Sequence, residues 1–134
     1  MRTFLVFGVL LATATGAHAQ AATPSEGVRY VFFDWGKVEV TRDGAATLDA
    51  LAASYRPGQS ISLTGYSDRS GPASSNRRTS AVRAEAVRDY LEGKGVPRRA
   101  MTAVGVGERD LLVPTEDGVR EVQNRRVEIR VEGP

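Results

Sequence analysis

The chain has 134 residues, 41% of them hydrophobic, and no cysteine, so its fold depends on burial and hydrogen bonds without disulfides. Eighteen basic and sixteen acidic residues give a formal net charge of +2, which is too balanced for a protein that binds nucleic acid through charge. The one histidine, His18, lies near the N-terminus, and the rest of the sequence therefore lacks the usual side chains for thiolate, imidazole-base and metal-ligand chemistry.

Residues 1–19 have the pattern of a secretory signal peptide. Arg2 gives a basic start, an apolar run covers residues 4–12, and residues 17–19 read Ala-His-Ala. The run is shorter than the ~17 to 25 residues of a membrane-spanning helix, and no second run follows. We predict cleavage after Ala19 and no transmembrane segment in the mature chain. A retained N-terminal anchor helix is the alternative.

Residues 20–27 predict a short linker, and residues 28–134 suit one compact domain with a single core. "VRYVFF" at 28–33 has the β-branched and aromatic composition of a strand. A helix is predicted to follow up to Tyr55. Thr41 is placed to cap this helix, and its apolar residues recur on one face.

The second half of the chain repeats this alternation. "SISLTG" at 60–65 predicts a strand, and helical periodicity follows over about 74–91. Two further strands are predicted at 100–107 and 125–132, with a long loop and a short helical turn near 119–123 between them. The order β-α-β-α-β-β predicts an α+β fold. It has a mixed four-stranded sheet, both helices on one face, parallel strands joined by the helices, and an antiparallel last strand.

Arg83 falls on the apolar stripe of the second predicted helix, together with Val87 and Leu91. A guanidinium there needs an anion, because an uncompensated charge out of water costs several kcal/mol. Asp68, directly after the strand at 60–65, is the candidate partner. An internal Asp68–Arg83 salt bridge without any ligand is the structural alternative.

Three further positions accompany this pair. Asp34 ends the first predicted strand, and parallel pairing with the strand at 60–65 would bring it to the sheet edge where ligands bind in such folds. Asn76 enters the helix, where it would brace the loop, cap the helix or meet a ligand. Arg125 and Arg126 precede the last strand, whose alternation turns only one of them inward.

Three ordered segments carry a family resemblance: "YVFFDWGKVEVT", "LTGYSDRSGPASSNRRTSAVRAEAVRDYLEGKGV" and "VGVGE…NRRVEI". Over about residues 29–132 the chain resembles the OmpA-like C-terminal domain, a family that includes the peptidoglycan-associated lipoprotein and flagellar-stator B subunits. The resemblance implies non-covalent binding of peptidoglycan through the diaminopimelate residue of its stem peptide. It also implies that Asp68 takes the ligand's ammonium and that Arg83 takes a ligand carboxylate.

The resemblance extends to the rest of the site. Asn76 and Arg125 match two further family positions, and backbone groups of the loop at 34–36 and of Ser67 complete the site in relatives. Trp35 has either a packing role or a place in the wall of the ligand groove. The predicted binding residues are Asp34, Trp35, Gly36, Ser67, Asp68, Asn76, Arg83 and Arg125.

Four positions depart from the family pattern. The family's histidine is Tyr66, its threonine is Ser67, the tyrosine before the asparagine is Ser75, and a leucine is Thr79. We expect these changes to alter the walls of the site and to leave its charges in place. A diaminopimelate side chain ends in an ammonium and a carboxylate on one carbon, and such a ligand suits an aspartate and an arginine held close together.

The predicted function is therefore that of a periplasmic protein, associated with the cell wall and outer membrane, that links peptidoglycan to an outer-membrane or envelope protein. We predict no catalytic residue, cofactor, metal or nucleic-acid partner. An enzyme would have to rely on a carboxylate pair such as Asp34 and Asp68. The alternative function is a periplasmic protein-interaction module of the same fold with impaired wall binding.

Overall fold

The structure, a computed structural model, describes residues 27–134, so the predicted signal peptide and nearly all of the predicted linker lie outside the described residues. The elements in chain order are β1 (Val28–Phe32), α1 (Arg42–Ser54), β2 (Ser60–Gly65), α2 (Ala73–Gly93), η1 (Arg98–Ala100), β3 (Met101–Gly105), η2 (Val122–Asn124) and β4 (Arg126–Glu132). No helix between residue 27 and the C-terminus is long and apolar enough to cross a membrane.

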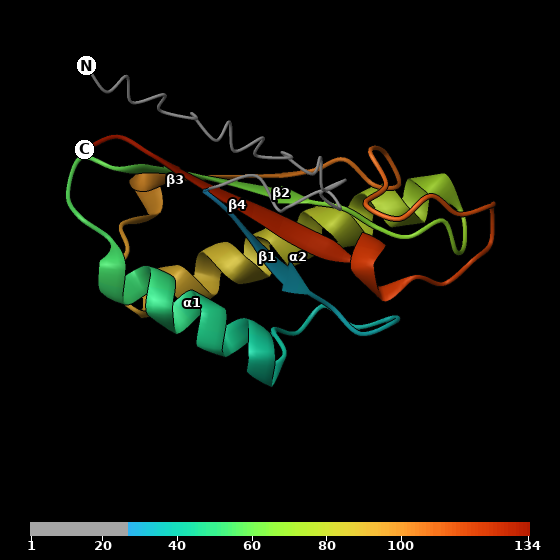
Figure 1. The fold of residues 1–134 in the computed structure, drawn as a ribbon, viewed down its shortest axis with the longest axis horizontal. Helices are drawn as coiled ribbons and strands as arrows, with labels where there is room; N and C mark the ends of the chain where they lie inside the picture. The colour runs from blue at the N-terminus through green and yellow to red at the C-terminus, as the bar shows by residue number, and fades with distance from the viewer. Residues whose placement is uncertain (1–26) are drawn as a thin grey trace, which may run out of the picture.

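The four strands form one mixed sheet in the order β1-β4-β2-β3. β2 and β3 are parallel, and β4 is antiparallel to both of its neighbours, β1 and β2. The two long helices pack on the same face of this sheet (Figure 1). The predicted α+β class, with the last strand antiparallel, is confirmed.

One expected strand pairing is wrong. The strands at 28–33 and 60–65 do not pair with each other, because β4 lies between β1 and β2. Since β4 is antiparallel to both, β1 and β2 still run in the same direction. Their carboxyl ends therefore meet at the same edge of the sheet, with the first residues of β4 between them.

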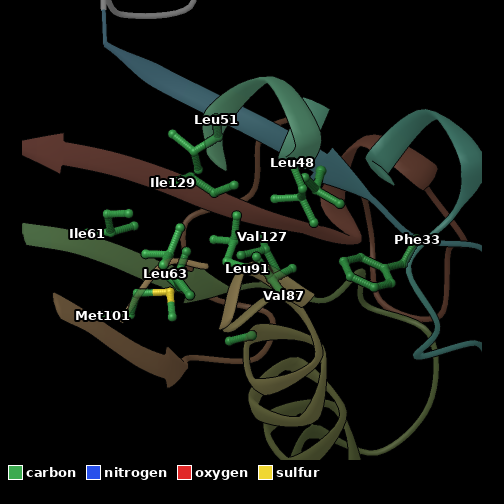
Figure 2. Packing of buried hydrophobic residues seen from close by; sticks show 13 residues of the cluster. Phe33, Leu48, Leu51, Ile61, Leu63, Val87, Leu91, Met101, Val127 and Ile129 are labelled. Atoms are coloured by element: carbon green, nitrogen blue, oxygen red, sulfur yellow. The ribbon is translucent and has the colours of Figure 1, made fainter. Parts of the chain in front are cut away.

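The core lies between the helices and the sheet (Figure 2). Alternation in the strands turns every second side chain toward the helices, and the helical repeat supplies the facing stripe. Thr41 caps α1 as predicted, with its hydroxyl accepting a hydrogen bond from the Gly44 amide at 3.0 Å. The side chains that close this core are Leu48 and Leu51 of α1, Val87 and Leu91 of α2, and Ile61, Leu63, Val127 and Ile129 of the sheet.

Two glycines let α2 approach the sheet closely. A Cβ on Gly65 would lie 2.0 Å from the carbonyl oxygen of Ser80, and one on Gly105 would lie 2.2 Å from the amide nitrogen of Ala81. No other residue type leaves room for the helix backbone here. These close contacts fix the distance between α2 and the sheet at Ser80 and Ala81, which directly precede the turn that carries Arg83.

The long segment between β3 and β4 is a loop, as predicted, although its helical turn, η2, is at 122–124 and not at 119–123. Asn124, which is fully buried, holds the middle of this loop. Its side chain accepts from the Val113 amide and donates to the Val113 carbonyl, both at 2.8 Å. The loop is thereby pinned beside the start of β4.

Candidate functional site

The candidate site is a cavity of about 370 Å³ at the sheet edge where β1 and β2 end. The loop after β1, the loop after β2, the first turns of α2 and the segment before β4 meet at this end of the molecule (Figure 1). Seven of the eight predicted binding residues line the cavity: Trp35, Gly36, Ser67, Asp68, Asn76, Arg83 and Arg125. The eighth, Asp34, has an exposed side chain outside the lining and contributes its carbonyl oxygen to Arg83.

Asp68 is buried at the floor of the site and accepts four hydrogen bonds from the protein. One carboxylate oxygen accepts from the Ser70 amide at 3.1 Å and from the Ser70 hydroxyl at 2.5 Å. The other accepts from the Arg125 guanidinium at 2.8 Å and from the Glu121 amide at 3.2 Å. A carboxylate has about four lone-pair positions, so these donors fill it.

The structural alternative, an internal salt bridge between Asp68 and Arg83, is wrong. The ion pair of Asp68 is with Arg125, whose Nη1 lies 2.8 Å from the carboxylate and whose Nε donates to the Phe33 carbonyl at 3.0 Å. The cause is the strand order. Because β4 runs between β1 and β2, the residue that precedes β4 lies between the two strand ends and reaches Asp68 first.

Arg83 is 2% exposed and has no carboxylate within salt-bridge distance in the part of the chain that the structure describes. It donates to the carbonyls of Lys37 at 2.9 Å and Asp34 at 3.3 Å, and it lies over the Phe33 ring. Burial, and then repulsion from Arg125, lower the pKa of Arg83 to about 10, against the attraction of Asp68. Arg83 is therefore a buried cation, charged at neutral pH, that lacks an anion.

Asn76 braces the loop between β2 and α2. It lies in the first turn of α2, four residues after the N-cap Pro72, so the capping interpretation is wrong. Its side-chain amide donates to the carbonyls of Asp68 at 3.3 Å and Gly71 at 3.4 Å, and to the Glu108 carboxylate at 3.2 Å. These contacts hold the backbone of Asp68 against the start of the helix.

The amide and the hydroxyl of Ser67 also form hydrogen bonds within the protein. Its amide donates to the Gly107 carbonyl at 2.8 Å, and its hydroxyl donates to the Asp68 carbonyl at 2.9 Å. The predicted contribution of its backbone to ligand binding is therefore limited to groups other than the N–H.

The rim of the cavity contains Ser70 and Arg120, two residues that the sequence did not predict, and both contact Trp35. Trp35 is half exposed, and its indole N–H donates to the Ser70 hydroxyl at 3.2 Å. The Arg120 guanidinium lies 3.5 Å above the centre of the Trp35 ring. Trp35 is thus part of the wall, and Ser70 connects it to Asp68. The Asp68-x-Ser70 spacing is a recognisable Asx-turn signal, whereas nothing in the sequence marked Arg120.

Tyr66 and Arg126 lie on the other face of the sheet. Alternation turns Arg125 and Arg126 in opposite directions as predicted, so only Arg125 lines the cavity, although both are buried, at 8% and 2% exposure. The Arg126 guanidinium lies 3.9 Å from the Tyr66 ring centre and 3.3 Å from Glu128, and it donates to the Asp110 carbonyl. The loop between β3 and β4 covers this face locally, which removes Arg126 from solvent.

The position of Tyr66 changes how the departures from the family pattern are interpreted. Tyr66 does not line the cavity, and burial together with the charge of Glu128 raises the pKa of its hydroxyl. Of the four departures, only Ser67, Ser75 and Thr79 are wall residues. The prediction that Tyr66 alters the wall is therefore wrong.

Arg69 does not line the cavity, but it has a structural role beside it. Its guanidinium pairs with Asp117 and donates to the Thr115 carbonyl at 3.1 Å, while its own carbonyl accepts from the Gly118 amide at 2.8 Å. It ties the two loops of the site together. A substitution at Arg69 is therefore unsuitable as a neutral control.

The Asp68 carboxyl gives the fold a defined pH dependence. Burial raises its pKa, but the hydrogen bonds from Ser70 and Arg125 outweigh burial and lower the pKa below the usual value. Because the folded-state pKa is the lower one, the ionised carboxylate stabilises the fold above pH ~3.9, and this contribution is lost as the pH falls through the folded-state pKa.

We expect Asp68→Asn to destabilise the protein by about 1–3 kcal/mol at pH 7, because the amide cannot accept from all four donors. The difference from wild type should shrink as the pH falls below about 4. Urea unfolding at pH 7 and at several lower values measures it. A difference that stays constant down to pH 2.5 would contradict the assignment.

Together, fold and cavity define an α+β domain with a buried arginine and an aspartate in a cavity at the end of its sheet. The chain belongs to the OmpA family, which it matches over residues 32–125. It is 34% identical over 125 residues to the peptidoglycan-associated lipoprotein of Rhizobium meliloti, covering 86% of this chain and 70% of that protein.

Two further comparisons agree with the family. An outer membrane protein of Gluconacetobacter diazotrophicus is 38% identical over 122 residues, which cover 81% of this chain but only 31% of that protein. The crystal structure of the peptidoglycan-associated lipoprotein from Burkholderia pseudomallei superposes with a TM-score of 0.72 at 30% identity, covering 78% of this chain and 90% of that one. The chain thus spans less than a third of this outer membrane protein, but most of the two peptidoglycan-associated lipoproteins.

Proposed function

We propose that this protein binds peptidoglycan non-covalently, in the periplasm, through the diaminopimelate residue of the stem peptide. The observation that carries the proposal is the buried Arg83, a cation without a carboxylate, in a cavity next to Asp68. A relative that is named a peptidoglycan-associated lipoprotein supports it, as do outer membrane proteins among the other relatives. A link from the wall to an outer-membrane or envelope protein is part of the same proposal.

In this proposal the distal carboxylate of diaminopimelate pairs with Arg83. Burial and repulsion from Arg125 make the empty site unfavourable for the Arg83 charge, and the opposite charge of an entering carboxylate offsets both effects. The guanidinium is already oriented by the carbonyls of Lys37 and Asp34, so little side-chain entropy is lost on binding.

The ligand's ammonium interacts with Asp68, whose acceptor positions are filled in the empty site. A new donor must displace one of the four present. Ser70 is the donor that yields, because a hydroxyl turns about one bond whereas the Glu121 amide and the Arg125 fork are fixed by their other contacts.

Catalysis is not part of the proposal. Asp68 is held ionised by a lowered pKa and cannot act as a general acid near neutral pH, and the side chain of Asp34 lies outside the cavity lining. Within residues 27–134, no group of three or more aspartate, glutamate or histidine side chains could hold a metal ion.

The filled Asp68 carboxylate favours the second candidate function, a protein-interaction module with impaired wall binding. If no ligand displaces Ser70, the ammonium has no acceptor and the site does not take the diamino acid. The two candidates therefore differ in one measurable property, which is affinity for a free stem peptide.

A matched pair of tripeptides tests the proposal. One is L-alanyl-γ-D-glutamyl-diaminopimelate, and the other ends in lysine, which lacks only the distal carboxylate. Titration calorimetry with the protein from Gln20 onward should give at least about tenfold tighter binding of the first, because charge-assisted hydrogen bonds of this kind contribute ~1.5–3 kcal/mol. Equal affinities would refute the role of Arg83, and binding of neither peptide would favour the interaction module.

A further inference from the structure

The charges that line the cavity are unbalanced. Three guanidiniums, those of Arg83, Arg120 and Arg125, face one carboxylate, that of Asp68, which leaves two positive charges in excess. No other carboxylate of residues 27–134 lines the cavity: Glu108 accepts from Asn76, and Asp117, next to the lining residue Gly118, pairs with Arg69.

Arg125 and Asp68 neutralise each other at 2.8 Å, so the two excess charges belong to Arg83 and Arg120. Neither of these makes a salt bridge within the described part of the chain. Arg83 is buried at the floor, whereas Arg120 is exposed at the rim. The cavity thus has two separate cations, one deep and one shallow, both without an anion.

Arg120 is held in place by stacking. Its guanidinium lies 3.5 Å over the Trp35 ring, and the Trp35 indole is fixed in turn by the Ser70 hydroxyl at 3.2 Å. Stacking uses the flat face of a guanidinium and leaves the N–H groups at its edge available. A planar fork with free N–H groups is the arrangement that binds a carboxylate through two parallel hydrogen bonds.

The distal end of diaminopimelate brings one carboxylate and one ammonium, so it carries no net charge and leaves Arg120 without a partner. We propose that Arg120 binds a second carboxylate of the ligand, and that the site selects a stem-peptide segment with two free carboxylates, one at Arg83 and one at Arg120. This inference rests on the proposed function. The second carboxylate belongs either to the glutamyl residue before diaminopimelate or to the chain end after it.

Two matched pairs of probes separate these sources. The first pair is γ-D-glutamyl-diaminopimelate and the same dipeptide with its glutamyl α-carboxylate amidated. The second pair is diaminopimelyl-D-alanine and its C-terminal amide. We expect wild type to bind the acid of one pair about five- to tenfold more tightly than the amide in titration calorimetry, because one charge-assisted contact is lost. The pair that shows the preference identifies the carboxylate.

The Arg120→Gln variant should lose this preference, with its affinity for the amide within about twofold of wild type, because only the contact with the second carboxylate is removed. Arg78→Gln is the matched control, since it removes an equal charge from an exposed position of α2 that does not line the cavity. It should keep the acid-over-amide preference.

Three results would overturn the inference. If the wild-type protein binds the acid and the amide of both pairs equally, it has no site for a second carboxylate, and only the proposed function remains. If Arg120→Gln lowers the affinity for the acid and for the amide to the same extent, Arg120 has only a structural role in its contact with Trp35. Wild type that binds none of the four probes overturns the inference and the proposed function together.

Discussion

Arg83→Ala should lower the affinity for the diaminopimelate tripeptide by about thirtyfold or more. Removing one partner of a buried, hydrogen-bonded charge pair costs ~2–5 kcal/mol, and ~1.4 kcal/mol corresponds to a factor of ten. The loss should be large because Arg83 is 2% exposed, so no solvent replaces the missing contact with the ligand carboxylate. Titration calorimetry with the tripeptide and circular dichroism of the variant measure binding and folding separately.

Arg99→Ala is the control for this experiment. Arg99 is an exposed arginine of η1, beyond the C-terminal end of α2, and its loss removes an equal charge without touching the cavity. Its affinity should remain within about twofold of wild type. If Arg83→Ala is folded and binds as well as Arg99→Ala, the cavity is not the binding site.

Asp68→Ala is a less direct test than Arg83→Ala. In the empty protein Asp68 pairs with Arg125, so its removal leaves the guanidinium of Arg125 buried without a counter-charge. It also removes the acceptor that holds the Ser70 and Glu121 amides. A loss of binding in that variant would combine a damaged fold with a missing ligand contact.

Gly105→Ala should have the largest effect on stability, a loss of about 3 kcal/mol or more in the free energy of unfolding. The added Cβ would lie 2.2 Å from the amide nitrogen and 2.4 Å from the Cα of Ala81. Both are backbone atoms of α2, which cannot rotate away as a side chain would. The helix must lift from β3, and the core beneath it must open. Urea unfolding at neutral pH gives the size of the loss.

Gly93→Ala is the matched control, because it makes the same change at the C-terminal end of α2 with no atom within 4 Å of the new Cβ. It should change stability by no more than about 1 kcal/mol, the difference in helix propensity between the two residues. Similar unfolding midpoints for the two variants would contradict the close packing of α2 on the sheet. A folded fraction of Gly105→Ala should also bind ligand weakly, since Arg83 moves with α2.

Local patterns predicted the secondary structure well because the forces that form these elements are local. The strand at 28–33 and the helix at 74–91 correspond to β1 at 28–32 and α2 at 73–93, and Thr41 caps α1 as expected. Hydrophobic alternation does not say which strand neighbours which. The insertion of β4 between β1 and β2 was therefore not predictable from periodicity.

The same limit explains what was missed in the site. The residue types were predictable, because Arg83 stands on an apolar stripe and Asp68 follows a strand. The partner of Asp68 depended on strand order, so Arg125 was predicted as a binding residue but not as the ion-pair partner of Asp68. Arg120 belongs to a loop without hydrophobic periodicity. Hydrogen bonds from Val113 to Asn124 and from Gly118 to Arg69 hold this loop beside the cavity. These are long-range contacts that no spacing in the sequence reveals.

Co-sedimentation with purified peptidoglycan sacculi tests the proposed function most directly. The protein from Gln20 onward is mixed with sacculi whose stem peptides contain diaminopimelate, in the presence and absence of the free diaminopimelate tripeptide. The proposed function predicts that the protein sediments with the sacculi and returns to the supernatant when the tripeptide competes. Protein that remains in the supernatant in both samples, while folded by circular dichroism, would contradict peptidoglycan binding.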